Sequence, residues 1–285
     1  MTVASFRRLV WTHYKKFGRH DLPWRKTHDA YKILVSEVML QQTQVERVVP
    51  FYKKFIKKFP TAKKLAAAPL SAVLKSWQGL GYNRRAKMLH QAAKELSMER
   101  SDLPMPIAEL EKLSGVGSYT ARAVAAFAYN QNVVFVETNI RTAVIEHFFN
   151  FTKQRKGMIY HTSTKKVSDK EVEEILKKAL PKGKAREWYS ALMDYGAYLK
   201  RSGISHNAKS KTNTRQSKFT GSIREARGAI MREFTNGVRS RIRLINLLGP
   251  SRRVQMNIAL KALIAEGLIN ENLLSTVSFR HPPKR

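Results

Sequence analysis

Apolar residues recur at spacings of three and four along most of the chain, and no segment alternates strictly between apolar and polar positions. This period predicts α-helices rather than strands. We expect a helix from residue 31 to a break before Pro50, and a second helical group over residues 139–149 and 169–199. Further short helices are predicted over residues 61–67, 71–77, 84–96, 107–113 and 120–129. Proline and glycine lie between these units, which indicates a compact array of helices in the first half.

Two stretches interrupt the helical pattern. Residues 151–166 are basic and polar and predict a loop. Residues 206–221 are rich in Lys, Ser, Thr and Asn, which predicts a linker or an arm that follows DNA. Helical spacing then returns over 223–234, 242–248 and 254–268, before an expected strand at 273–279. This order suggests a small winged helix-turn-helix module, although it also fits a plain helical cap.

The composition combines a folded core with a very large positive charge. Hydrophobic residues make up 43% of the 285, and 53 Lys and Arg face 21 Asp and Glu, for a net charge of +32 at pH 7. Such a charge calls for an anionic partner, and nucleic acid is favoured over an acidic membrane or another polyanion. The charged start and the short apolar run at 123–129 argue against a signal peptide or a membrane span. A cytoplasmic or nucleoid-associated protein without a membrane partner is expected.

The chain has no cysteine, which excludes disulfides, thiolate catalysis and cysteine-ligated clusters. Its eight histidines show no metal-binding spacing, so no metal site is expected.

One glycine-rich segment, Leu-Ser-Gly-Val-Gly-Ser-Tyr-Thr at 113–120, stands between two predicted helices. Glycines one residue apart allow a tight turn and a close approach of the backbone to a phosphate, at the N-terminus of the next helix. The segment therefore predicts a phosphate-binding hairpin. Its expected DNA contacts are Gly115, Val116, Gly117 and Thr120.

Five further blocks accompany this hairpin. They are LPWR at 22–25, SEVMLQQTQV at 36–45, GLGY at 79–82, VETNIR at 136–141 and ALMDYGA at 191–197. In this order, over about residues 5–200, the chain resembles the helix-hairpin-helix DNA glycosylases, and within them the MutY-like adenine glycosylases. The resemblance implies a mostly α, two-domain glycosylase fold.

That fold is expected to be divided as follows. The six-helix domain with the hairpin covers residues 22–130, the second helical domain 1–21 and 131–205, the basic linker 206–221, and the winged-helix-like module 222–285.

Two carboxylates are the expected catalytic pair. Breaking an N-glycosidic bond calls for one protonated carboxyl group, for the leaving base, and one ionised group beside the cationic sugar. Glu37 stands in an apolar helical stretch, where burial would raise its pKa. The resemblance makes it the acid that protonates adenine and handles the water; a solvated surface glutamate is the alternative.

Glu137, beside Asn139, takes the place of the family's usual aspartate and is one methylene longer; alternatively it is only a helix-start carboxylate. Tyr119 stands where bifunctional relatives hold a Schiff-base lysine, so no lyase chemistry is expected by this route. It is expected to orient Glu137 or the water, or else to be a packed aromatic. Asn139 completes the expected catalytic set.

Gln41, Gln42 and Tyr82 match the family's wedge, which fills the gap left by a flipped base. Trp24 and Arg25 are expected to line the base pocket, with a purely structural role for Trp24 equally open.

Two departures from the resemblance stand out. Lys200, Asn207, Ser210 and Gln216 occupy the spacing of the family's four cluster cysteines, so no iron–sulfur cluster is expected. No cofactor is expected, except that the hairpin resembles ones that hold a monovalent cation. The tail is too short and too helical for the family's Nudix-like domain.

These features predict a monomeric, monofunctional glycosylase acting on duplex DNA. The expected base is a mispaired adenine opposite guanine or 8-oxoguanine. The alternatives are a mismatch uracil or thymine glycosylase, a DNA-binding homologue with attenuated catalysis, and a basic structural protein.

Overall fold

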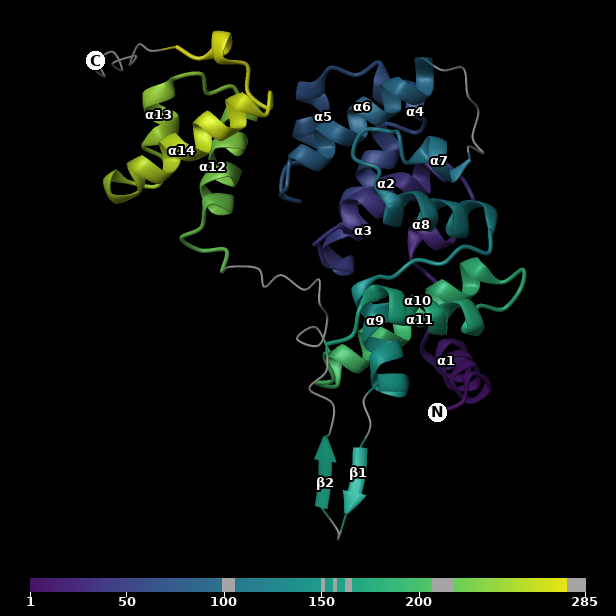
Figure 1. Ribbon diagram of the computed structural model, residues 1–285. Helices are drawn as coiled ribbons and strands as arrows, with labels where there is room; N and C mark the ends of the chain where they lie inside the picture. Colours follow the sequence, from purple (N-terminus) through teal and green to yellow (C-terminus); the bar gives the residue numbers. More distant parts are fainter. Residues whose placement is uncertain (99–105, 150–151, 156–157, 162–165, 207–217, 276–285) are drawn as a thin grey trace. The chain divides into compact units, whose positions relative to one another are not determined.

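The computed structural model describes residues 1–98, 106–149, 152–155, 158–161, 166–206 and 218–275, and these are mostly helical, as predicted (Figure 1). The helices are α1 (Val3–Phe17), α2 (Ala30–Leu40), α3 (Val45–Lys58), α4 (Ala62–Ala66), α5 (Leu70–Trp77), α6 (Arg84–Met98), α7 (Ile107–Leu110), α8 (Ser118–Tyr129), α9 (Thr138–Val144), α10 (Asp169–Ala179), α11 (Ala185–Arg201), α12 (Ile223–Thr235), α13 (Arg241–Ile245) and α14 (Arg253–Ala265). Shorter helical turns lie at Pro23–Arg25, Ile145–Phe149, Pro250–Arg252 and Glu271–Leu273.

The chain forms two compact units. The first comprises Met1–Glu37, Asp102–Lys112 and Val116–Arg215. Its core is centred on α11, whose Trp188 and Tyr189 are fully buried among side chains of α1, α9 and α10. Phe135 stacks on Tyr189 with 4.0 Å between the ring centroids. Burial of such large aromatic side chains is the main stabilising contribution to this unit.

The closest approach inside this core depends on Gly196 of α11. A Cβ atom added there would lie 2.0 Å from the carbonyl oxygen of Asn139, in the first turn of α9. Only glycine lets the two helices pack at this distance, and the packing fixes the start of α9.

The second unit comprises Val38–Ser101, Leu113–Gly115 and Gln216–Arg285. In its first part α6 packs on α4 and α5, with Leu65 and Trp77 fully buried. The C-terminal part, which we call the C-terminal module, packs α12, α13 and α14 around Ile230, Leu244 and Leu260. The prediction of three helices in this tail is confirmed.

Two local predictions were wrong or incomplete. The helix predicted from residue 31 to Pro50 ends at Leu40, and Pro50 lies inside the next helix, α3. The lost backbone hydrogen bond there is offset by burial of Val48, Tyr52 and Phe55 on the inner face of α3. The loop expected over 151–166 contains an antiparallel hairpin of β1 (Thr152–Arg155) and β2 (Met158–His161).

The strand expected at 273–279 falls partly outside the described residues. Within them, Glu271–Leu273 is a 3-10 turn and Ser275 forms a single β-bridge with Ser240. The described part of the tail therefore has helices without a strand of its own.

The segment expected to be a linker from residue 206 begins with a packed residue. His206 is buried, and its Nε2 lies 2.5 Å from Oε2 of Glu146. Residues 207–217, which include the predicted basic stretch, lie outside the described part of the chain.

The two units do not follow the domain limits predicted from the sequence, because residues 22–37 and 116–130 group with the first unit. The predicted limits stay a prediction. Among the described helices, none is long and apolar enough to cross a bilayer.

Candidate active site

Glu37 is a buried carboxyl group on the apolar helix α2. Its neighbours Ile33, Leu34 and Val38 are buried as well, and Glu37 itself is only 6% exposed. Loss of hydration disfavours the charged form and raises the pKa of Glu37 from its ordinary value of 4.5 to about 7. The alternative of a solvated surface glutamate is therefore wrong.

Tyr119 is the hydrogen-bond partner of this carboxyl group. It lies in the first turn of α8, and its phenol oxygen donates to Oε2 of Glu37 at 3.0 Å. Burial and the nearby carboxylates raise the pKa of Tyr119 well above 10, so the phenol keeps its proton and remains a donor. The ring packs edge-on against Phe135 at 5.6 Å, so the predicted aromatic packing is also present.

Glu137 is the N-cap residue of α9. Its Oε2 accepts the backbone N–H of Asn139 at 2.7 Å, and its Oε1 accepts the hydroxyl of Thr138 at 2.5 Å. Its charge is close enough to contribute to the raised pKa of Glu37. The helix-start alternative is supported, because this carboxylate caps α9. The same carboxylate also acts on the pKa of Glu37.

Lys200, at the end of α11, is a residue whose contact the sequence did not reveal. Its Nζ donates to Oγ1 of Thr138 at 3.0 Å, and Thr138 in turn donates to Glu137. Burial lowers the pKa of Lys200, while the charge of Glu137 opposes that shift. The lysine is therefore a second support for the carboxylate, reached through a hydroxyl group.

Asn139 joins the site through its backbone. Its N–H binds Glu137, and its carbonyl is the atom that Gly196 allows to approach α11. Glu37, Tyr119, Glu137 and Asn139, the four residues expected to be catalytic, all belong to the first unit. The arrangement can do acid–base chemistry, since it holds one carboxyl group whose raised pKa lets it both give and take a proton near pH 7, close to a second that accepts hydrogen bonds on both oxygens.

The glycine-rich hairpin connects α7 and α8. Gly115 has a φ of +77°, and a Cβ atom there would lie 2.6 Å from Cβ of Met88, so only glycine fits. Gly117 is the N-cap of α8 and has open space around it. The side chains of Val116 and Thr120 are buried, so any phosphate contact at these two positions is left to their backbone.

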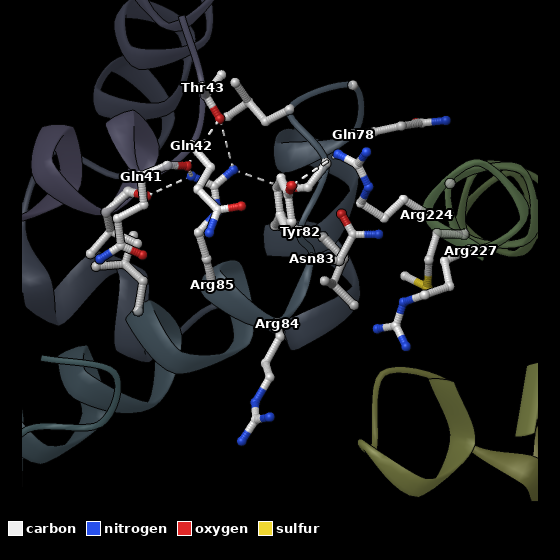
Figure 2. A pocket seen from close by; sticks show the side chains of 18 of the residues that line it. Gln41, Gln42, Thr43, Gln78, Tyr82, Asn83, Arg84, Arg85, Arg224 and Arg227 are labelled. Atoms are coloured by element: carbon white, nitrogen blue, oxygen red, sulfur yellow. Dashed lines mark hydrogen bonds between the residues drawn. The ribbon is translucent and has the colours of Figure 1, made fainter. Parts of the chain in front are cut away.

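The expected wedge residues lie in the second unit (Figure 2). Gln42 and Tyr82 have φ values of 54° and 49°, the left-handed region that side chains other than glycine and asparagine seldom adopt. Such strain persists only where the surroundings hold it, and it gathers at functional sites.

Arg85 holds the loop that carries the wedge glutamines. Its Nη1 donates to the carbonyls of Val38, Met39 and Gln41 at 2.9, 2.9 and 2.5 Å, at the end of α2. Its guanidinium carbon lies 5.3 Å from the ring centroid of Tyr82. Burial lowers the pKa of Arg85 to about 10, which leaves it charged near neutral pH. One cation thus positions both wedge segments.

Trp24 is buried, and Arg25 is held by a carboxylate. The guanidinium of Arg25 makes two hydrogen bonds to Asp194, at 2.6 and 2.9 Å. Arg19 binds the same carboxylate, and the pKa of Asp194 is lowered because these two arginines outweigh its burial. Burial supports the structural alternative for Trp24, Arg25 has a structural contact that was not predicted, and the role of both residues in a base pocket stays a prediction.

The residues at the cluster positions do not fit an iron–sulfur cluster. Lys200 is bound to Thr138, and the other three positions lie outside the described residues but carry no cysteine. Among the described residues, no group of three or more His, Asp or Glu side chains is placed to hold a metal ion. The expected absence of a cofactor stays a prediction.

Comparisons with known proteins show the family of the chain. Residues 35–182 match the HhH-GPD superfamily base excision DNA repair proteins. An adenine DNA glycosylase of Mycolicibacterium smegmatis is 34% identical over 95% of this chain and 94% of that protein. One of Mycobacterium tuberculosis is 46% identical over 50% of this chain and 46% of that protein. The structure of a thermostable thymine-DNA glycosylase matches with a TM-score of 0.59 and 26% identity, over 73% of this chain and 92% of that one.

The chain therefore belongs to the HhH-GPD superfamily of base excision DNA repair proteins. The sequence singled out these carboxylates, the hairpin and the expected wedge residues, but not the side chains that contact them. Lys200 was singled out only for standing at the spacing of a cluster cysteine. Arg224, whose Nη1 donates to the phenol oxygen of Tyr82 at 3.0 Å, and Arg85 lie outside the sequence blocks quoted above.

Proposed function

We propose that the protein is a monofunctional DNA glycosylase that excises a mispaired adenine, opposite guanine or 8-oxoguanine, from duplex DNA. The observation that carries the proposal is the buried Glu37, whose pKa of about 7 gives it a proton to donate at neutral pH. The adenine glycosylases to which the chain is similar over most of its length support adenine as the base.

In the proposed reaction Glu37 protonates the flipped adenine as the N-glycosidic bond breaks, and the bonding electrons leave with the base. The sugar becomes an oxocarbenium ion, which the carboxylate of Glu137 stabilises across the site. The ionised Glu37 then takes a proton from the attacking water, whose oxygen bonds to the anomeric carbon. Glu37 regains its proton, and the products are free adenine and an abasic site.

Tyr119 keeps Glu37 in place through the 3.0 Å hydrogen bond and forms no imine, because a phenol is not an amine nucleophile. Lyase cleavage by this route is therefore not part of the proposal.

The rest of the chain would handle the DNA. Gln41, Gln42 and Tyr82 fill the gap left by the flipped base, and the backbone of the hairpin at 115–117 binds a phosphate. The net charge of +32 draws the protein to DNA, where it would act as a monomer in the cytoplasm or on the nucleoid.

The test is a set of duplexes with adenine, uracil, thymine or hypoxanthine opposite guanine and 8-oxoguanine, treated with alkali to reveal abasic sites. Strand cleavage at adenine alone, and only after alkali, is the expected result. The matched control for the inactive variant Glu37→Gln is Glu174→Gln, which makes the same change at an exposed glutamate of α10. This control should excise like the wild type. A wild-type enzyme that leaves every adenine intact would refute the proposal.

A second candidate function is the removal of thymine or uracil opposite guanine. It is favoured by the structural match to the thymine-DNA glycosylase. The same set of duplexes separates the two functions, because cleavage at thymine or uracil without cleavage at adenine would select this second one.

A further inference from the structure

A groove of about 1250 Å³ lies in the second unit, beside the wedge residues (Figure 2). Arginine side chains make its lining largely cationic. They are Arg47, Arg84, Arg85, Arg224, Arg227 and Arg232, the last three from helix α12. Ser114 and Gly115 of the glycine-rich hairpin line the same groove. The turn that is proposed to bind a phosphate therefore begins at a surface that attracts one.

Helix α6 packs against this end of the hairpin. Met88 of α6 lies so close to Gly115 that a Cβ atom would not fit between them. Glu95, two turns further along the same face of α6, binds the residue before this glycine. Its Oε2 accepts the backbone N–H of Ser114 at 2.8 Å, and its Oε1 accepts the hydroxyl of Ser114 at 2.7 Å. One carboxylate thus holds both donors of Ser114.

An acidic side chain is an unexpected neighbour for a turn that binds phosphate, because like charges repel. Burial alone would raise the pKa of Glu95, but the hydrogen bonds from Ser114 and Gln91 outweigh burial and lower the pKa. Glu95 is therefore ionised at neutral pH, and its bonds to Ser114 are of the stronger, charge-assisted kind. The fixed position of Ser114 is the gain that offsets the repulsion.

The backbone N–H that follows Ser114 is the group that these bonds orient. Its direction depends on the conformation of Ser114 and on Gly115, whose φ of +77° is a value that glycine adopts readily. Within the described part of the chain, the N–H of Gly115 donates to no backbone group or side chain. Gly115 is exposed and lines the cationic groove, so this N–H suits a phosphate oxygen.

We propose that Glu95 is a positioning residue for DNA binding, which fixes Ser114 so that the N–H of Gly115 meets a phosphate oxygen of the duplex. The inference rests on the proposed function, in which the backbone of the hairpin binds a phosphate, and it names the side chain that sets that backbone. Glu95 acts through Ser114 and not on the DNA itself. An acidic residue then strengthens the binding of a polyanion, which is the opposite of what its charge alone would do.

The first test separates the contact from the charge. Glu95→Ala removes both, whereas Glu95→Gln removes the charge but keeps an oxygen that can accept the N–H of Ser114. Both changes are made in the excision-inactive Glu37→Gln protein, the parent, and titrated with a duplex carrying adenine opposite guanine. Glu95→Ala should bind about tenfold more weakly, in the range of one hydrogen bond to a charged group, and Glu95→Gln at least as tightly as the parent. If both bind more tightly than the parent, Glu95 acts by its charge alone and the proposal is overturned.

The second test determines whether the lost affinity belongs to one phosphate. Each phosphate near the adenine is replaced in turn by a methylphosphonate, which lacks the charge and one of the oxygens. One replacement should weaken the parent about tenfold but Glu95→Ala less than about twofold, because that variant has already lost the contact. A general loss of stability would leave this sensitivity unchanged. The proposal fails if Glu95→Ala stays as sensitive as the parent at every phosphate.

The matched control is Glu46→Ala, which removes the same charge from an exposed glutamate in the first turn of α3, in the same unit. It should not lower the affinity. If circular dichroism shows that Glu95→Ala does not fold, Ser114→Ala tests the same contact, because it removes the hydroxyl donor alone and should weaken binding about threefold. Unchanged affinity of the folded variants would end the inference while the proposed function stands. If the wild type excises no adenine, the proposed function has failed instead.

Discussion

The site around Glu37 and the groove beside Tyr82 contrast in almost every physical respect. Glu37 is buried in apolar surroundings that raise its pKa to about 7, and its backbone is an ordinary helix. Tyr82 is held by two guanidinium groups in a cationic groove, on a left-handed backbone. An acid must be kept dry to hold its proton, whereas a surface that grips a polyanion must stay charged and wetted. The two tasks therefore call for opposite environments, which different segments of the chain supply.

The largest effect is expected when the buried carboxyl group loses its acidic proton. Glu37→Gln keeps the shape and the contact with Tyr119 but has no acidic proton, so single-turnover excision of adenine should fall by about 10²–10⁴-fold. Duplex affinity should stay near that of the wild type, because the cationic groove is untouched. Excision within about threefold of the wild type would remove Glu37 from its role.

The cationic side should dominate the dependence on salt. If about 6–8 phosphates are contacted, the logarithm of the binding constant falls against that of the salt concentration with a slope of roughly −5 to −7. Deletion from Lys211 onward, which removes α12, should flatten this slope, and Glu37→Gln should not change it. A wild-type slope shallower than about −2 would show that the charge of +32 is not a DNA-binding surface.

The burial of Glu37 should also make the free energy of unfolding depend on pH. The pKa of Glu37 is raised in the folded state, from 4.5 to about 7, so the fold binds a proton that the unfolded chain loses. This contribution is complete below pH 4.5 and is lost as the pH rises through 7. The free energy of unfolding of the wild type should fall relative to Glu37→Gln by about 3 kcal/mol, at roughly 1.36 kcal/mol per pKa unit. Urea titrations of both proteins across this range measure it, and parallel curves would contradict the raised pKa.

Glu137→Asp tests whether the site is built for the longer carboxylate. We expect a loss of about tenfold in single-turnover rate, because moving a charge by one methylene changes its interaction with the cationic sugar by about 1 kcal/mol. Glu137→Gln, which carries no charge, is the inactive reference. A faster Asp variant would instead mark the natural enzyme as attenuated.

The smallest effect is expected at Lys200. Lys200→Met removes the donor to Thr138, and the rate should fall about fivefold, in the range of one hydrogen bond, with no change in duplex affinity. Lys200→Arg should recover most of the rate, because it keeps a donor. Exposed Lys170 provides the control, since Lys170→Met changes the net charge equally. If both Met variants lose rate alike, the lysine acts only through the overall charge.

The sequence alone predicts many of the helices, but it predicts the site residues without the contacts that hold them. Helical spacing located α4 to α6 and α12 to α14 because one face of each is buried and the pattern is local. Pro50 does not end a helix here, because the packing of a whole helix face outweighs one missing hydrogen bond. The hairpin of β1 and β2 was missed because its pairing, and not its composition, makes it a sheet.

The motifs located Glu37, Tyr119 and Glu137, since each lies in a block with a recognisable order of residues. The contacts that hold them link distant segments. Lys200 reaches Thr138, and Arg224 reaches Tyr82, across gaps of 62 and 142 residues. No local pattern encodes such pairs, because only the folded chain brings them together.

The packing of Gly196 against Asn139 has a consequence for how easily a single mutation could impair the repair of DNA. Because a single added methyl group would meet the carbonyl at the head of α9, the start of that helix, and Glu137 with it, would have to shift. Near 1 Å of misplacement is enough to cost a catalyst about a hundredfold. A one-letter change at the codon for Gly196, a residue outside the expected catalytic set, would thus weaken the proposed excision and leave mispaired adenines to be copied.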